Sequence, residues 1–173
     1  MRGDPVMMEW ILPLPKVVRE ALISQFYATE QNLDSTRIKA LLNHPPNKHC
    51  LARVYLGQKN GTFDHITPLR NFPLYLGPME QIGIDTVPLA RAMGKAYAIL
   101  HRGAAVNGDD VEFVLGTSVT EAQGPDHGSG LQHRNVQSYL LGFGQCEAVD
   151  LSLSQDPGIV YQAFKGAMVT GDN

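Results

Sequence analysis

The strongest constraint on the fold is one amphipathic stretch in the middle of the chain. The sequence TVPLARAMGKAYAILHR, residues 86–102, repeats apolar side chains at the three- or four-residue spacing of a helix. These side chains are Leu89, Met93, Ala96 and Leu100. A short loop follows, and the apolar run VEFVLG over 111–116 then predicts a strand. Gly94 interrupts the helical pattern, and we expect it to mark a close packing contact.

The rest of the pattern predicts an α+β fold that is mainly helical, with a few short antiparallel strands in hairpin-like pairs. Apolar periodicity, prolines and N-cap residues predict helices over 15–27, 34–44, 77–84 and 156–169. Short apolar or alternating runs predict strands over 6–12, 50–57 and 136–144. The Gly-, Ser- and His-rich stretch 120–135 predicts a mobile loop. No internal repeat is visible, so residues 1–173 are expected to form a single domain.

Charge and composition argue against two classes of partner. The chain is 43% apolar and 18% charged, which is typical of a folded domain. Its net charge is −3 and it contains no run of Lys and Arg, so it does not resemble a nucleic-acid-binding protein. No apolar run approaches the roughly 20 residues that span a bilayer, and the N-terminus lacks the apolar segment of a signal peptide. We therefore expect neither a nucleic-acid nor a membrane partner.

The two cysteines, Cys50 and Cys146, lie far apart in the sequence. A structural zinc site normally takes four Cys or His ligands in paired short spacings, and neither cysteine has such a partner. Two reduced thiols are typical of a cytosolic protein. The sequence therefore predicts a cytoplasmic protein with no metal and no cofactor.

The loop that leads into strand 111–116 carries the main candidate catalytic residues. Asp109 and Asp110 are adjacent, and strand alternation predicts that Asp110 and Glu112 share one face. His101 ends the preceding helix, one loop away. A histidine beside carboxylates can act as general acid and base near neutral pH. The alternative is that Gly108 and Asp109 form a turn and Glu112 faces water.

A second candidate site lies in RNFPLYLGPM, residues 70–79, which concentrates aromatic and apolar side chains. Phe72, Tyr75 and Met79 are candidates for the wall of a ligand pocket, because such pockets are mostly apolar. Glu80 could face the same cleft as the loop aspartates. The alternative is that these apolar side chains pack in the core.

Two motifs together resemble the C-terminal lobe of a protein-kinase-like fold. There a long helix ends in Leu-His, a catalytic loop leads into a strand, and a second strand ends in Asp-Phe-Gly, whose aspartate holds magnesium. Here Leu100-His101 matches the helix end, Asp110 falls near a metal-ligand position, and Gly142-Phe143-Gly144 stands in place of Asp-Phe-Gly. Since Gly142 replaces the magnesium ligand, the resemblance implies the fold without phosphoryl transfer.

Longer motifs resemble a fungal family of unknown function whose members are often labelled "zinc finger protein". They occur in the family's order and cover most of the chain: ILPLPKVVREALI, CLARVYLG, LRNFPLYLGPMEQIGID, ARAMGKAYAILHRGAAVNGDDVEFVLG and LLGFGQC. The label gains no support from this chain, which has no zinc-finger spacing.

Two functions remain open. The first is a degenerate kinase-C-lobe-like binding or interaction module that self-associates as a homodimer. The second is a cofactor-independent enzyme of fungal secondary metabolism, which isomerises, cyclises or dehydrates a small apolar metabolite. The enzyme predicts a closed, partly apolar cavity with the carboxylates at its edge, and the module predicts a flat apolar patch.

Overall fold

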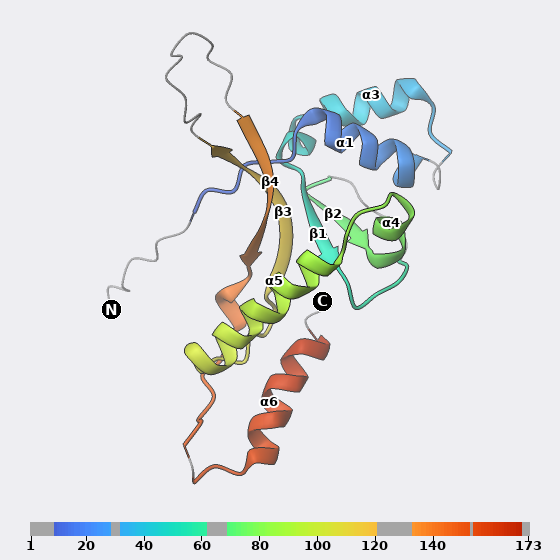
Figure 1. The fold of residues 1–173 in the computed structure, drawn as a ribbon. Coiled ribbons are helices and arrows are strands. Elements are labelled where there is room, and N and C mark those ends of the chain that lie inside the picture. Colours follow the sequence, from blue (N-terminus) through green and yellow to red (C-terminus); the bar gives the residue numbers. More distant parts are fainter. Residues whose placement is uncertain (1–8, 29–31, 62–68, 121–132, 153, 171–173) are drawn as a thin grey trace.

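One mixed β-sheet forms the centre of the computed structural model, which describes residues 9–28, 32–61, 69–120, 133–152 and 154–170 (Figure 1). The sheet has four strands in the order β2-β1-β3-β4. The strands are β1 (Leu51–Tyr55), β2 (Asn71–Tyr75), β3 (Glu112–Thr120) and β4 (His133–Leu141). β1 runs antiparallel to β3, and β3 antiparallel to β4. Helices and one sheet thus make the predicted α+β fold.

The parallel pairing of β1 and β2 departs from the sequence prediction of antiparallel, hairpin-like pairs. Leu51 pairs with Asn71 and Tyr55 with Tyr75, in one direction along both strands. The prediction was wrong here because Pro73 sits in the middle of β2 and hid the strand signal. Proline is tolerated there since β2 is an edge strand, whose outer side needs no ladder hydrogen bond.

The predicted helices are confirmed, with ends shifted by a few residues. The first helix, α1 (Lys16–Leu22), continues into the π-helical turn η1 (Ile23–Tyr27). Asp34 caps α3 by accepting a hydrogen bond from the Arg37 N–H at 2.8 Å, and Asp156 accepts one from the Gly158 N–H at 2.8 Å at the start of α6. The further helices are α3 (Ser35–Asn43), η2 (Pro45–His49), α4 (Leu76–Gln81), α5 (Val87–Ala98), η3 (Ile99–Gly103), η4 (Phe143–Gln145) and α6 (Pro157–Thr170).

The long amphipathic helix forms as predicted, but its glycine has a different role. α5 and the π-helical turn η3 together cover the predicted range. A Cβ atom added at Gly94 would meet no atom within 4 Å. The expected close packing contact at Gly94 is therefore wrong, because that side of α5 faces open space.

The N-terminal strand predicted over 6–12 is not formed by the part of it that the structure describes. Residues 6–8 lie outside the described residues, and beyond them Leu12 makes a single bridge to Thr117 of β3. The Leu12 N–H donates to the Thr117 carbonyl at 3.3 Å, and the Thr117 N–H donates back at 2.8 Å. The pairing cannot extend beyond Leu12 because Pro13 and Pro15 lack the N–H groups of a ladder.

The core lies on the sheet face that α1–η1 and α5 cover. Phe113 of β3 meets the Tyr97 ring of α5 with 5.7 Å between ring centres. Ala52 pairs with Leu115, and both face the side of α1. The described residues contain no helix that is long and apolar enough to cross a membrane. Residues 121–132 of the predicted mobile loop over 120–135 lie outside the described residues. The prediction is wrong at the two ends, because Thr120 belongs to β3 and residues 133–135 belong to β4.

We expect the stability of the protein to depend on pH through Cys50. Its thiol lies in this core, and only 1% of the residue's surface is exposed. Burial raises its pKa from 9.0 to about 11, although the Arg19 charge and a backbone hydrogen bond from Phe72 act in the opposite direction. The folded state thus disfavours the thiolate. The contribution of Cys50 to the free energy of unfolding is therefore complete below pH 9 and is lost as the pH rises to about 11.

We expect the free energy of unfolding to fall by about 2–3 kcal/mol over this pH interval because of Cys50. Urea titrations at several pH values measure the fall. Other groups also titrate there, so the control is Cys50→Ala, in which the slope should become shallower. An equal slope in both proteins would contradict the assignment to Cys50.

Candidate functional site

The loop between η3 and β3 has an unusual backbone at three positions. The φ angles are 52° at Ala105, 73° at Gly108 and 58° at Asp110. A residue with a side chain costs roughly 1–2 kcal/mol in this left-handed region, so the surrounding structure must hold Ala105 and Asp110 in place. Because Asp110 is left-handed and lies outside β3, the prediction that it shares a strand face with Glu112 is wrong.

A second segment, residues 146–149, holds this loop. The Asn107 N–H donates to the Glu147 carbonyl at 2.9 Å, and the Asn107 side-chain oxygen accepts from the Glu147 N–H at 2.9 Å. The Val149 N–H donates to the Ala105 carbonyl at 2.7 Å. Loop and segment therefore form a short ladder that closes the base of the β3–β4 ribbon.

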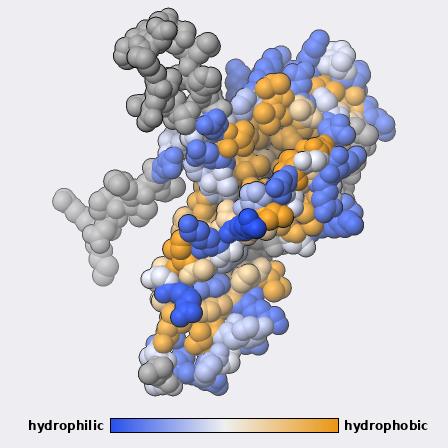
Figure 2. Space-filling view, viewed as in Figure 1, coloured by the Kyte–Doolittle hydropathy of each residue, from blue (hydrophilic) through white to orange (hydrophobic). Residues whose placement is uncertain are grey.

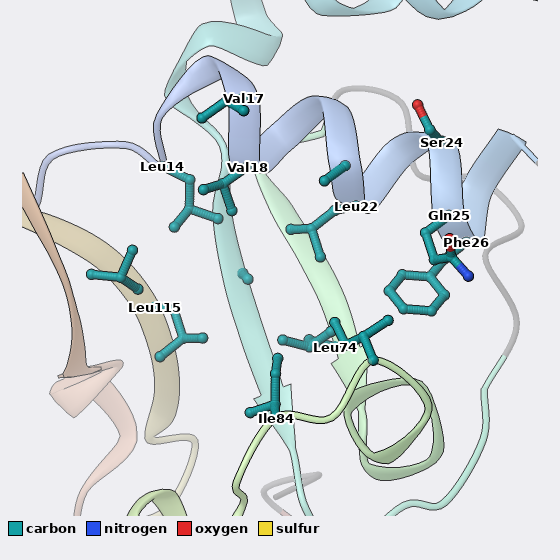
Figure 3. Close-up of a pocket in the computed structure, with 14 residues that line it drawn as sticks. Leu14, Val17, Val18, Leu22, Ser24, Gln25, Phe26, Leu74, Ile84 and Leu115 are labelled. Atoms are coloured by element: carbon teal, nitrogen blue, oxygen red, sulfur yellow. The ribbon is translucent and has the colours of Figure 1, made fainter.

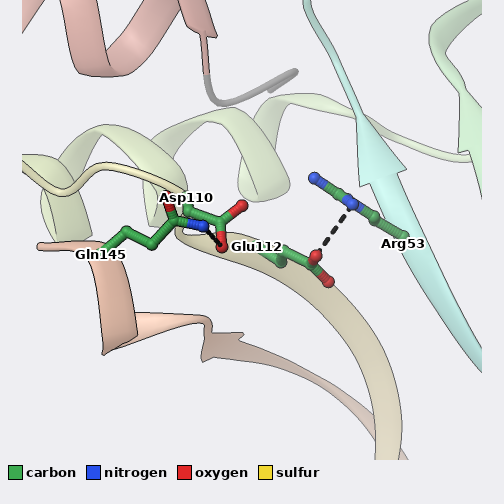
Figure 4. A network of polar contacts seen from close by, with 4 residues as sticks. All are labelled: Arg53, Asp110, Glu112 and Gln145. Carbon is green, nitrogen blue, oxygen red and sulfur yellow. Dashed lines mark hydrogen bonds and ion pairs between the residues drawn. The ribbon is translucent and has the colours of Figure 1, made fainter.

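The carboxylates of the loop bind protein groups on different elements (Figure 4). An Asp109 oxygen accepts from the Asp110 N–H at 3.1 Å, which is a turn-forming contact. The Gln145 side-chain amide donates to Asp110 at 3.0 Å. Glu112 forms an ion pair with Arg53 of β1 at 2.9 Å. Figure 4 shows the Asp110 carboxylate directed to Gln145 and the Glu112 carboxylate directed to Arg53. These contacts stabilise the loop and the sheet.

The described residues contain no group of three or more His, Cys, Asp or Glu side chains arranged to hold a metal ion. The three neighbouring carboxylates therefore do not form such a cluster, in spite of their closeness in sequence.

His101 lies on η3, at the end of the long helix, as predicted. Its Nε2 atom is 3.1 Å from the Asn107 carbonyl oxygen, which can only accept, so Nε2 carries the hydrogen. The ring stacks on Phe164 of α6, with ring centres 4.2 Å apart and an angle of 13° between planes. The histidine thus joins η3, the loop and α6, and its Nε2 proton is engaged by the main chain.

Cys146 lies beside the same loop, with its Sγ atom 3.6 Å from the Asp109 carbonyl oxygen. Burial raises the pKa of this thiol. A backbone hydrogen bond from Gly108 lowers it, and the charges of Asp109 and Asp110 raise it further. A nucleophilic cysteine requires the thiolate, so this environment does not favour covalent catalysis.

Gly142, which the motif resemblance aligned with the aspartate of Asp-Phe-Gly, directly follows β4. Its φ angle is 84°, and a Cβ atom there would overlap the Asp110 carbonyl oxygen. A side chain therefore cannot be accommodated at this position while Asp110 stays where it is.

The predicted ligand wall is distributed over three environments. Phe72 and Met79 are fully buried in the core. Tyr75 stacks on Tyr55, with 5.1 Å between ring centres, on the opposite face of β2 from Phe72. Glu80 is exposed on α4. The structure does not bring these four side chains together around one space.

Sequence reasoning missed an apolar cavity in the described structure, which has a volume of about 600 Å³. It lies between the α1–η1 helix and the sheet, with the loop after α4 closing one side (Figure 3). Figure 2 shows apolar residues gathered in the hollow beside α1. The described lining residues are Leu14, Val17, Val18, Ala21, Leu22, Ser24, Gln25, Phe26, Ala52, Leu74, Ile82, Ile84, Leu115 and Val136.

The signal for this cavity was the apolar stripe of the first helix. The stripe predicted a face packed on the core, yet Val17 is 72% exposed. Leu22 of the same helix is buried, whereas Val18 is half-buried at the cavity. Periodicity shows which residues share a face, but it does not show whether another element fills the space opposite that face.

A second cavity, of about 440 Å³, lies between α5 and α6. His101 lines it together with Tyr97, Met93 and Met168. The Phe164 ring on His101 places α6 beside this space. Of the predicted catalytic residues, His101 is therefore the one that reaches a described cavity.

Comparisons with known proteins give no assignment: no family model, curated protein or solved structure matches the chain significantly.

Proposed function

We propose that the protein is a non-catalytic binding module that holds a small, neutral, apolar molecule between the α1–η1 helix and the sheet. One observation carries the proposal: the described lining of the 600 Å³ cavity contains no acidic, basic, histidine or cysteine side chain. This cavity differs from both expectations drawn from the sequence. It is concave, where the module predicted a flat patch, and it lacks the carboxylates that the enzyme requires at its edge.

The lining chemistry supports a neutral ligand. Twelve of the fourteen lining residues are apolar, and the other two, Ser24 and Gln25, are uncharged. Moving an unpaired charge from water into such surroundings is costly, so a charged ligand group would have to remain outside. The volume lies within the range of about 300–1,000 Å³ typical of small-molecule pockets.

The candidate catalytic residues in and around the loop between η3 and β3 also support a binding role. Asp110 and Glu112 make hydrogen-bonded or ionic contacts with Gln145 and Arg53, and the Nε2 proton of His101 is donated to the main chain. General acid–base catalysis needs such groups within reach of the reacting atoms. None of these residues belongs to the cavity lining.

We also propose that the chain derives from a kinase-like fold and belongs to the fungal family that its motifs resemble. The support is the order of elements: α5 with η3, the loop, the antiparallel β3–β4 ribbon, and Gly142 directly after β4. The overlap that any side chain at Gly142 would make with Asp110 argues against phosphoryl transfer through this site.

Nile red, a neutral apolar dye, tests the binding function. We expect its fluorescence to rise and saturate with the wild-type protein, and a mixture of neutral lipids or terpenoids to displace it. Ala21→Trp should block the cavity, because Ala21 is an exposed residue of the α1 helix that lines it. We expect this variant to bind the dye at least tenfold more weakly, about 1.4 kcal/mol or more.

Ala92→Trp is the matched control, since Ala92 is also an exposed helical alanine but lies on α5, outside the described lining of the cavity. It should bind the dye like the wild type. Equal binding by Ala21→Trp and Ala92→Trp, or no saturable binding by the wild type, would contradict the proposed function.

A further inference from the structure

The two edges of the sheet differ in how they are protected. β2 forms one edge, spans five residues and carries Pro73 at its centre. Proline removes a hydrogen-bond donor, and a short edge with proline resists the addition of another strand. β4 forms the other edge, spans nine residues and contains no proline.

The middle of β4 is open in the part of the chain that the structure describes. Four consecutive residues, 135–138, are exposed, although they point alternately to the two faces of the sheet. Neither face of the strand is therefore covered there, and no described strand follows β4 in the sheet order. Its outward N–H and C=O groups form a template for another extended strand.

The chemistry of the strand indicates which partner fits it. The segment NVQSYLL, residues 135–141, carries no charged side chain. Edge strands that avoid self-pairing usually carry charge, lysine above all, so that two copies repel each other. Two identical segments can lie side by side here without like-charge repulsion, whereas a charged partner strand would find no complementary charge within residues 135–141.

We propose that β4 is an interface between two copies of this chain, paired antiparallel about a two-fold axis near Gln137. Antiparallel pairing of identical strands is symmetric, so the β4 edge of each copy is occupied by the other copy and the assembly closes as a dimer. The pairing also places Val136 of each copy near the axis, on the cavity face that it shares with Leu115. An eight-stranded sheet results, with both α1 helices on one side. This interface goes beyond the proposed ligand and does not depend on it.

Sedimentation velocity of the full chain tests the interface. We expect the wild type to shift from monomer to dimer within the micromolar range, because one strand pair is a small interface. The variant Asn135→Lys/Gln137→Lys adds four positive charges at the centre of the dimer. Both side chains are exposed and point away from the cavity face, so the monomer should stay folded and keep its dye binding. Its dimer dissociation constant should rise at least about tenfold.

The control Gln81→Lys/Gln162→Lys makes the same change in net charge at exposed positions on α4 and α6. It should dimerise like the wild type. Hydrogen exchange of the wild type gives a second measurement: outward amides of residues 135–141 should exchange more slowly as the protein concentration rises.

A wild type that stays monomeric at high micromolar concentration would overturn the proposal. So would equal weakening by the control, which would assign self-association to another surface, or a dimer whose β4 amides exchange at the monomer rate. Each of these outcomes leaves the dye-binding result unaffected, so failure of the interface and failure of the ligand site are distinguishable.

Discussion

Gly142→Ala should destabilise the protein by about 2–4 kcal/mol, one of the two largest effects expected of a single substitution. Two costs add at this position. Placing alanine at a φ angle of 84° costs roughly 1–2 kcal/mol. Its Cβ atom would also overlap the Asp110 carbonyl oxygen, and forcing the backbone apart costs about as much again.

Urea denaturation followed by circular dichroism measures this effect. Gly144→Ala is the control, since a Cβ atom at Gly144 would meet nothing within 4 Å. Gly142 and Gly144 lie two residues apart in the same turn, so the control should change the free energy of unfolding by less than about 1 kcal/mol. Similar losses in both variants would show that the close approach to Asp110 is not what requires glycine.

Gly142→Asp should lower the free energy of unfolding at least as much as Gly142→Ala. This result would distinguish the site from a magnesium site that has merely lost its ligand.

Asn47→Ala should cost about 3 kcal/mol, for a reason that concerns hydrogen bonds. Asn47 is 1% exposed and connects three parts of the fold. Its amide donates to the Leu41 carbonyl at 2.8 Å, and its side-chain oxygen accepts from the Leu69 N–H at 2.8 Å. Its own carbonyl accepts from the buried Arg19 guanidinium at 2.8 Å. Alanine keeps the last contact but leaves the Leu69 N–H without its acceptor, at roughly 1–3 kcal/mol. The Leu41 carbonyl loses the side-chain bond as well, at about 1 kcal/mol, and keeps only its bond from the His44 N–H at 3.2 Å.

The matched control for Asn47→Ala is Asn43→Ala, because Asn43 is exposed at the end of α3. Its replacement should change the midpoint of urea denaturation little. If Asn47→Ala behaved like Asn43→Ala, the bonds of Asn47 to Leu41 and Leu69 would contribute nothing net to stability.

Sequence reasoning succeeded where one local pattern determines the structure. The periodicity of residues 86–102 predicted α5 and η3. N-cap residues at the starts of 34–44 and 156–169 predicted where two further helices begin, and Asp34 and Asp156 make the capping bonds there. It failed at β2, where Pro73 resembles a break in a strand but occupies an edge that tolerates it. The helices were predictable and β2 was not, because the order of strands in a sheet pairs segments that are distant in the chain and leaves no local signal in the sequence.

The candidate site shows the same division. The closeness of His101, Asp109, Asp110 and Glu112 was predictable from the chain. Their partners were not, because Gln145, Arg53 and Phe164 come from elements 35 or more residues away from the groups they contact. Those distant partners argue for a structural role for these side chains.

The order of the sheet also has a kinetic consequence. β3 and β4 lie close in the chain and pair over nine residues, so their ribbon can form from local contacts. β1 must instead pair with β3 across about 60 residues of intervening chain, since Arg53 stands opposite Val114. Closing so long a loop before its contacts are gained slows folding. We therefore expect the β3–β4 ribbon to form early and the docking of β1, which completes the core and the cavity above it, to limit the rate at which the chain becomes able to bind.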